Sequence, residues 1–154
     1  MERVTKSLEE TQALAAEWIR SLSAQGAKSA IVVGLQGDLG SGKTSFAQGV
    51  AKALGVNEHV TSPTFILERV YKVGSLENCF QIANCKFSHL IHIDAYRLDS
   101  ADELKHLGFA ELAADPGNLI LIEWPERVAE ALPKDILTLK FEFVDENTRK
   151  ITLK

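Results

Sequence analysis

Residues 37 to 44 read Gly-Asp-Leu-Gly-Ser-Gly-Lys-Thr, and this stretch decides the fold. Its glycines let the backbone turn tightly and aim several N–H groups at one point, where they can hold a phosphate oxygen. The lysine can reach the β- and γ-phosphates of a nucleotide, and the threonine hydroxyl can bind the Mg²⁺ between them. The octet therefore predicts a phosphate-binding loop rather than a chance glycine-rich turn. The expected nucleotide-binding residues are Gly37, Asp38, Leu39, Gly40, Ser41, Gly42, Lys43, Thr44 and Ser45.

The residues on both sides of the octet predict a strand, a loop and a helix. Residues 30–35 form an apolar run of strand length, and residues 46–54 have the apolar spacing of a helix that begins near Lys43. The positive end of such a helix adds to the attraction for a phosphate. A strand before the loop and a helix after it are the context that this motif requires.

Further along the chain, two acidic residues follow apolar runs of strand length. Asp94 ends residues 89–94, and Glu123 ends residues 118–123. Such uniformly apolar runs are typical of parallel strands that are covered on both faces, and ligands of open α/β sheets bind at the carboxyl ends of the strands. Nucleotide hydrolysis needs one carboxylate near Mg²⁺ and one that positions water, so both acids are candidates for these roles. An isolated acid at a strand end can also be only a turn residue.

The other patterns predict additional helices and hairpins. Capping-box patterns at residues 7–10 and 100–103 predict helices over about 8–23 and from 101 to about 106–108. We expect a strand at 65–73 and a short helix over 125–131. The alternating tail predicts an antiparallel hairpin of strands 136–143 and 150–153. Residues 74–87 have no clear period and read as a hairpin excursion or a surface insertion.

Composition and length limit the class of protein. With 154 residues, 45% hydrophobic and 25% charged, the chain fits one domain over residues 1–154. We expect an α/β fold of the P-loop NTPase type, with a mainly parallel central sheet flanked by helices and antiparallel C-terminal strands. The apolar runs are too short for a membrane helix and the first residues do not resemble a signal peptide, so a cytoplasmic protein is expected. The net charge is −4 with scattered Lys and Arg, which argues against direct binding of nucleic acid.

A zinc site would be the alternative use of the cysteines. Cys79 and Cys85 lie close in sequence to His89 and His92. Two histidines three residues apart on a strand point to opposite faces, and the cysteines lack the usual gap of two to four residues. We therefore expect no zinc.

The segment Ser62-Pro63-Thr64 follows the predicted phosphate-loop helix. Many nucleotide hydrolases place a segment that senses the γ-phosphate there, although a Ser-Pro-Thr sequence can also be simply a turn. The switch-like role is one interpretation of these three residues.

Taken in order, these motifs resemble the TsaE (YjeE) family over nearly the whole chain. The motifs are Gly-Asp-Leu-Gly-Ser-Gly-Lys-Thr44, Thr-Ser-Pro-Thr-Phe65, His-Ile-Asp-Ala-Tyr-Arg-Leu98, the stretch 103–108 and Ile-Glu-Trp-Pro125. The resemblance implies an ATPase with ATP and Mg²⁺ as cofactors that serves synthesis of N6-threonylcarbamoyladenosine, a modified adenosine next to the anticodon of tRNA. It also implies TsaD and TsaB as partners, with tRNA reached only through that complex.

The same resemblance suggests roles for single residues. Lys43, Asp94 and Glu123 would be catalytic, with Thr44 and Glu123 as Mg²⁺ ligands, and Ser62, Pro63 and Thr64 would form the switch-like loop. Trp124 matches the Glu-Trp pair of that family, and we expect it to be a core aromatic residue that supports Glu123 rather than a contact of the nucleotide. Candidates for the adenine side are Ser7, Thr11 and Arg149.

Two other functions are compatible with a phosphate-binding loop. One is a nucleotide-gated binding module that regulates assembly of the complex and whose hydrolysis is incidental. The other is a small-molecule kinase, which would usually need an arginine-rich lid that the sequence does not suggest. The sequence lacks an Asn-Lys-x-Asp run that would read guanine, which favours ATP over GTP.

Overall fold

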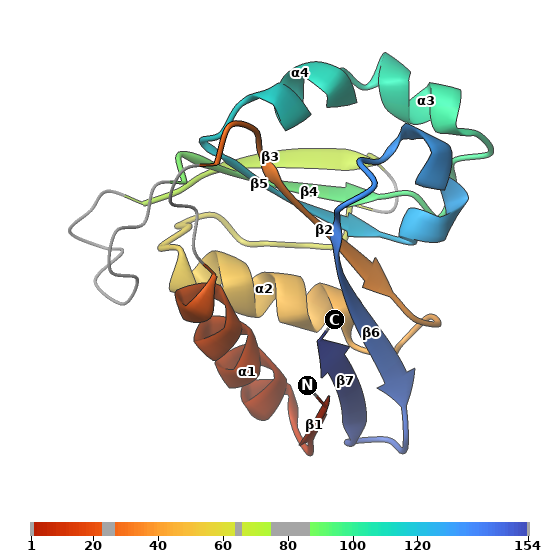
Figure 1. Cartoon of the computed structure of the whole chain (residues 1–154). Helices are drawn as coiled ribbons and strands as arrows, with labels where there is room; N and C mark the ends of the chain where they lie inside the picture. Colours follow the sequence, from red (N-terminus) through yellow and green to blue (C-terminus); the bar gives the residue numbers. More distant parts are fainter. Residues whose placement is uncertain (1, 23–26, 64–65, 75–86, 154) are drawn as a thin grey trace.

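The fold is built on a mixed sheet with helices on both faces (Figure 1). The computed structural model describes residues 2–22, 27–63, 66–74 and 87–153. Within these residues, seven strands pair in the order β1-β7-β6-β2-β5-β4-β3. The strands are β1 (Glu2–Thr5), β2 (Ile31–Gln36), β3 (Glu68–Lys72), β4 (His89–Asp94), β5 (Asn118–Glu123), β6 (Leu137–Phe143) and β7 (Arg149–Leu153).

The centre of the sheet is parallel and its edges are antiparallel. Strands β6, β2, β5 and β4 run in the same direction, whereas β3 pairs antiparallel to β4, β7 to β6, and β1 to β7. This arrangement confirms the predicted α/β class with a parallel centre and antiparallel C-terminal strands. The carboxyl ends of the parallel strands meet at one edge, where ligands of such sheets bind.

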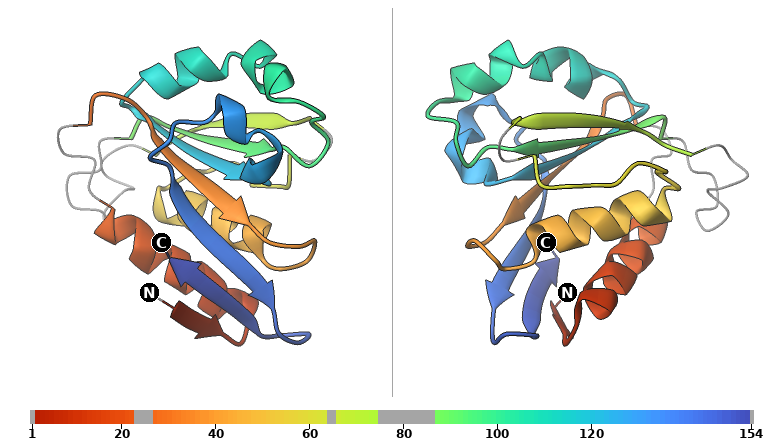
Figure 2. Two further views of the ribbon diagram at one scale, coloured as in Figure 1. Left: turned by 45° about the vertical axis from the view of Figure 1, so that its right-hand side comes forward. Right: turned by 180° about the vertical axis from the view of Figure 1, so that it is seen from behind.

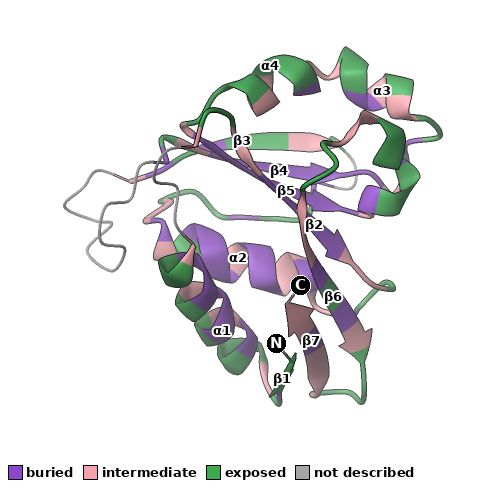
Figure 3. Cartoon of the chain, viewed as in Figure 1, coloured by how far each residue is buried: buried purple, intermediate pink, exposed green. Residues whose placement is uncertain are grey.

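The helices form two layers. Helices α1 (Leu8–Ser21) and α2 (Lys43–Ala53) cover one face, and α3 (Ala101–His106), α4 (Phe109–Ala114) and the 3-10 turns η1 (Pro125–Arg127) and η2 (Ala129–Ala131) cover the other (Figures 1 and 2). The apolar side chains of β2, β4 and β5 alternate between these layers. Leu119 and Leu121 pack on the α1–α2 side, and Ile120 and Ile122 on the α3–α4 side. The central strands are therefore buried on both faces (Figure 3).

Several predicted elements agree with the structure, and others need correction. Ser7 caps α1 as predicted, because the Glu10 N–H donates to its Oγ at 3.1 Å. Ser100 precedes α3 but makes no side-chain capping hydrogen bond. The predicted helix is therefore present, but the predicted capping box at its start is wrong. The expected helix at 125–131 is two 3-10 turns, separated where Val128 leaves helical geometry.

Other differences concern strand and helix boundaries. Strand β3 begins at Glu68 because Leu67, at φ 65°, lies in the left-handed region and interrupts extended backbone. The sequence did not predict β1 or α4, and the unpatterned stretch 75–86 with Cys79 and Cys85 lies outside the described residues. No helix among the described residues is long and apolar enough to cross a membrane.

Candidate functional site

The predicted phosphate-binding loop, residues 37–44, connects β2 to α2 at the carboxyl edge of the parallel strands. Gly37 has φ 148° and Gly42 has φ 102°, conformations that L side chains rarely adopt. A Cβ at Gly37 would also collide with the carbonyl oxygen of Phe141. Gly42 is the N-cap of α2, so Lys43 and Thr44 begin the helix and the loop faces its positive end.

Lys43 is held at the base of the loop. Its Nζ donates to the carbonyl oxygens of Gly37 at 2.7 Å and Asp38 at 2.9 Å, and lies 4.5 Å from the centre of the Trp124 ring. Burial lowers the pKa of Lys43, and the nearby charges of Glu123 and Asp94 oppose this change. The acids thus favour the cationic form that a phosphate group would require.

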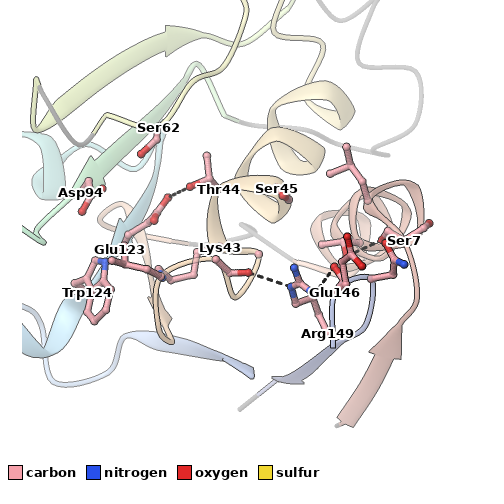
Figure 4. A pocket seen from close by; sticks show the side chains of 16 residues that line it. Ser7, Lys43, Thr44, Ser45, Ser62, Asp94, Glu123, Trp124, Glu146 and Arg149 are labelled. Atoms are coloured by element: carbon pink, nitrogen blue, oxygen red, sulfur yellow. Dashed lines mark hydrogen bonds between the residues drawn. The ribbon is translucent and has the colours of Figure 1, made fainter. Parts of the chain in front are cut away.

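Glu123 is the buried centre of the site. The residue is only 3% exposed. Its Oε1 accepts a hydrogen bond from Thr44 Oγ1 at 2.9 Å and is hydrogen-bonded to His92 Nε2, also at 2.9 Å. In the parallel pairing of β4 and β5, Asp94 lies opposite Glu123. The structure therefore brings the two predicted acids together on the side of the cavity where Lys43 and Thr44 lie, as Figure 4 shows.

Asp94 and Trp124 have their own fixed positions. The backbone N–H of Tyr96 donates to Asp94 Oδ1 at 2.9 Å. Trp124 has φ 60°, and the centre of its ring lies 4.5 Å from Lys43 Nζ and 5.1 Å from the centre of the Tyr96 ring. Trp124 thus lines the site in addition to packing against the α3–α4 core.

A cavity of about 330 Å³ opens over these groups. Such a volume lies at the lower end of the range of small-molecule pockets. Of the predicted residues, the cavity is lined by Leu39, Gly40, Gly42, Lys43, Thr44, Ser45, Ser62, Asp94, Glu123, Ser7, Thr11 and Arg149. Gly37, Asp38, Ser41 and Pro63 do not line it, and Thr64 lies outside the described residues.

Of the adenine-side candidates, Ser7 and Arg149 lie across the cavity from Asp94 and Glu123 (Figure 4), and Thr11 also lines it. Their polar groups already bind within the protein. Ser7 Oγ accepts from the Glu10 N–H, and Thr11 Oγ1 donates to the Ser7 carbonyl oxygen at 3.1 Å and lies 2.8 Å from Thr5 Oγ1.

Arg149 connects the C-terminal hairpin to the phosphate-binding loop. Its Nε donates to the carbonyl oxygen of Gly40 at 3.1 Å, its Nη1 donates to that of Asp145 at 2.7 Å, and its guanidinium lies 4.7 Å from the centre of the Phe143 ring. Arg149 thus supports the wall of the cavity through backbone carbonyls.

The residues present fit a nucleotide and Mg²⁺. Ser41 Oγ is buried and has no hydrogen-bond partner among the described residues. Apart from the two chain neighbours of Gly40, no described residue has an atom within 4 Å of its Cβ position, so the loop is open on that side. Hydroxyl and carboxylate oxygens, which Thr44, Asp94 and Glu123 provide, are the ligands that Mg²⁺ prefers. In the described part of the chain, no three His, Cys, Asp or Glu side chains group as a metal cluster.

The sequence did not predict the contact of His92 with Glu123. It also did not predict that the hairpin residues Glu146 and Asn147 line the cavity. His92 precedes Asp94 by two residues, and side chains two apart on a strand share a face. That spacing was the available signal for His92. The hairpin gives no such signal, because its place beside α1 depends on the tertiary fold.

The chain is similar to known proteins over most of its length. The family model "Threonylcarbamoyl adenosine biosynthesis protein TsaE" matches residues 5–151. The tRNA threonylcarbamoyladenosine biosynthesis protein TsaE of Rickettsia felis is 39% identical over 142 residues, covering 92% of this chain and 72% of that protein. The protein of the same name from Bacillus subtilis is 36% identical over 148 residues, covering 96% and 81%.

A solved structure shows the same fold. The crystal structure of Bacillus subtilis YdiB superposes with a TM-score of 0.71 at 31% identity, covering 99% of this chain and 83% of that one. The sequence match over almost the whole chain, together with this shared fold, shows that the chain belongs to the TsaE family of threonylcarbamoyl adenosine biosynthesis proteins.

Proposed function

We propose that this protein is a Mg²⁺-dependent ATPase that serves the synthesis of N6-threonylcarbamoyladenosine in tRNA. In this proposal it acts in the cytoplasm as an accessory of the TsaD–TsaB transferase and reaches tRNA only through that complex. The observation that carries the proposal is the hydrogen bond between Thr44 and the buried Glu123 at the start of α2, beside Lys43.

Binding of the triphosphate would use the loop and the helix behind it. The loop N–H groups and the positive end of α2 supply fixed partial charges, and Lys43 supplies a full one. Lys43 Nζ already lies at the loop, with the carbonyls of Gly37 and Asp38 as partners. Because Lys43 is only 4% exposed and already held by two carbonyls, its side chain would lose little conformational freedom on binding.

Hydrolysis would use the two acids. Bound Mg²⁺ would supply electrostatic stabilisation of the charge that develops on the phosphate oxygens. Thr44 and Glu123 would hold the cation, while Asp94 on the neighbouring strand would orient the attacking water. The register of β4 and β5 supports this division, because it puts Asp94 level with Glu123.

The test replaces Lys43, which would contact the phosphates. We expect Lys43→Ala to lose ATP binding and hydrolysis in the presence of TsaD and TsaB, and Lys52→Ala, an exposed lysine on the same helix, to retain both. Equal hydrolysis by Lys43→Ala and the parent protein would refute the proposal. Glu123→Ala should still bind nucleotide but lose Mg²⁺-dependent turnover.

Reconstitution distinguishes this function from a nucleotide-gated binding module. Modified tRNA is counted per transferase with ATP, with ADP or with a non-hydrolysable analogue of ATP. An ATPase function predicts repeated turnover with ATP alone. Undiminished repeated turnover with the analogue would show that occupancy suffices and that hydrolysis is incidental.

A further inference from the structure

We propose that His92 is a positioning residue that fixes the Glu123 carboxylate for Mg²⁺. The inference rests on the proposed function and names a residue that has no place in it so far. The His92 ring lies within β4, is 0% exposed, and places Nε2 at 2.9 Å from Glu123 Oε1.

The sheet brings these two side chains together. His92 pairs across the ladder with Leu121, and Asp94 pairs with Glu123. His92 therefore lies one step behind Asp94 on the same face of β4, and its ring reaches diagonally to the neighbouring strand. Thr44 approaches the same carboxylate oxygen from α2, so three separate elements meet at Oε1.

The donors and acceptors determine what each group contributes. A carboxylate that binds a cation only accepts hydrogen bonds, so in this role of Glu123 both Thr44 Oγ1 and His92 Nε2 would donate to Oε1. The hydroxyl of Thr44 keeps its lone pairs for the cation while its hydrogen points to Glu123. With two donors on Oε1, the carboxylate cannot rotate freely, and Oε2 is left for the cation.

The other ring nitrogen shows that this bond is what orients the imidazole. His92 Nδ1 is buried and has no hydrogen-bond partner among the described residues. The ring is therefore held by packing and by the contact with Glu123. Groups that orient a metal ligand in this way typically contribute about 10- to 100-fold to metal affinity or activity.

Two substitutions at this position separate the hydrogen bond from packing. His92→Leu fills similar space without a donor, and His92→Gln keeps an N–H donor that can reach Oε1. Binding of a non-hydrolysable ATP analogue is measured by calorimetry over a series of Mg²⁺ concentrations, with melting curves of each variant as the folding control. We expect His92→Leu to need about 10- to 100-fold more Mg²⁺ for half-maximal tightening, and His92→Gln to recover most of this loss.

The outcomes distinguish this inference from the proposed function. If the parent protein binds the analogue without any dependence on Mg²⁺, the proposed cation site fails, and the role of His92 with it. If the parent depends on Mg²⁺ and folded His92→Leu behaves like the parent, only the role of His92 is overturned. Equal losses in folded His92→Leu and His92→Gln would show that packing alone matters, and would also overturn it.

A measurement on the unaltered protein keeps the inference testable if the leucine variant does not fold. Nitrogen-15 spectra of the histidine rings report which nitrogen carries hydrogen, and the signals that vanish in His92→Gln identify this ring among the four histidines of the chain. We expect hydrogen on Nε2 of His92. Hydrogen on Nδ1 with a bare Nε2 would overturn the inference, because that tautomer cannot donate to Glu123.

Discussion

The hydroxyl of Thr44 donates to the carboxylate of Glu123 across 2.9 Å, although 79 residues separate them in the chain. Thr44 is at the start of α2 and Glu123 at the end of β5, so the bond joins the helix behind the phosphate-binding loop to the central sheet. In the proposed function both groups are Mg²⁺ ligands, and this bond would hold them in place before the cation binds. Such preorganisation reduces the ordering that binding would require.

The first prediction concerns the Thr44 hydroxyl. Thr44→Val keeps the branched shape but removes the oxygen, so we expect Mg²⁺-dependent ATP hydrolysis to fall at least about 10-fold, the scale of a lost metal contact. Thr44→Ser keeps the hydroxyl and should retain most of the activity. Steady-state hydrolysis over a range of Mg²⁺ concentrations tests this, and equal activity of the valine variant would remove Thr44 from the cation site.

The second prediction concerns Gln48, one turn further along α2. Its Nε2 donates to the carbonyl oxygen of Val60 at 3.0 Å, which ties the helix to the segment that leads to Ser62. Gln48→Met keeps the length of the side chain and removes this bond, whose net value is about 0.5–1.5 kcal/mol. We expect hydrolysis to fall about two- to tenfold while affinity for ATP changes little, if the segment at Ser62 responds to the γ-phosphate.

Gln12 on the facing helix α1 provides the control for that experiment. Gln12 and Gln48 line the same surface groove, away from the phosphate-binding loop. Gln12→Met should leave hydrolysis unchanged. A parallel loss in both methionine variants would indicate a general effect on the α1–α2 packing, and no loss in Gln48→Met would separate this bond from hydrolysis.

The sequence was sufficient for the parts of the fold that are encoded locally. The glycines of the loop, the apolar runs of β2, β4 and β5, and the Ser7 cap predict their elements because each depends on neighbouring residues. Strand β1 escaped prediction because it is a four-residue edge strand whose ladder partner, β7, lies at the other end of the chain. Helix α4 is short, and Gly108 before it reads as the end of a helix.

The site divides along the same line. The positions of Asp94 and Glu123 at strand ends are visible in the sequence, whereas the bond from His92 to Glu123 requires the pairing of β4 with β5. The bond from Arg149 to the Gly40 carbonyl spans 109 residues and has no local signature. Contacts of this kind depend on the tertiary arrangement, which residue spacing alone does not reveal.

The third prediction concerns the carboxyl group of Glu68 at the start of β3. Burial raises the pKa of Glu68 above its ordinary value of 4.5, and Oε2 has no hydrogen-bond partner within the described part of the chain. The folded state therefore binds this proton more tightly than the unfolded state does, and the free energy of unfolding falls as pH rises from 4.5 through the folded-state pKa.

Replacing Glu68 with a neutral residue removes this loss of stability at higher pH. We expect Glu68→Gln to melt at a higher temperature than the parent at pH 7, with a difference that shrinks as pH is lowered through the folded-state pKa. Melting curves from pH 4 to pH 8, at about one-unit steps, measure it. Glu58→Gln, which removes an exposed carboxyl elsewhere on the protein, controls for net charge. A Glu68→Gln advantage that grows toward acid pH would contradict the assigned sign.

The fourth prediction concerns the contact between α1 and α2, where Gly49 allows the two helices to approach closely. A Cβ at Gly49 would lie 2.7 Å from Gln12 Cα and 2.8 Å from both Gln12 O and Ala15 Cβ, so two of the three contacts are with backbone. Overpacking of this kind costs about 1–3 kcal/mol, and alanine recovers about 1 kcal/mol through its higher helix propensity. We expect Gly49→Ala to lower the free energy of unfolding by up to about 2 kcal/mol, measured by urea denaturation.

Lys52→Ala, at an exposed position on the same helix, provides the control and should stay within about 0.5 kcal/mol of the parent. A Gly49→Ala protein as stable as the parent or more so would mean that α1 can move away without loss, and that the close approach does not hold the helix pair together.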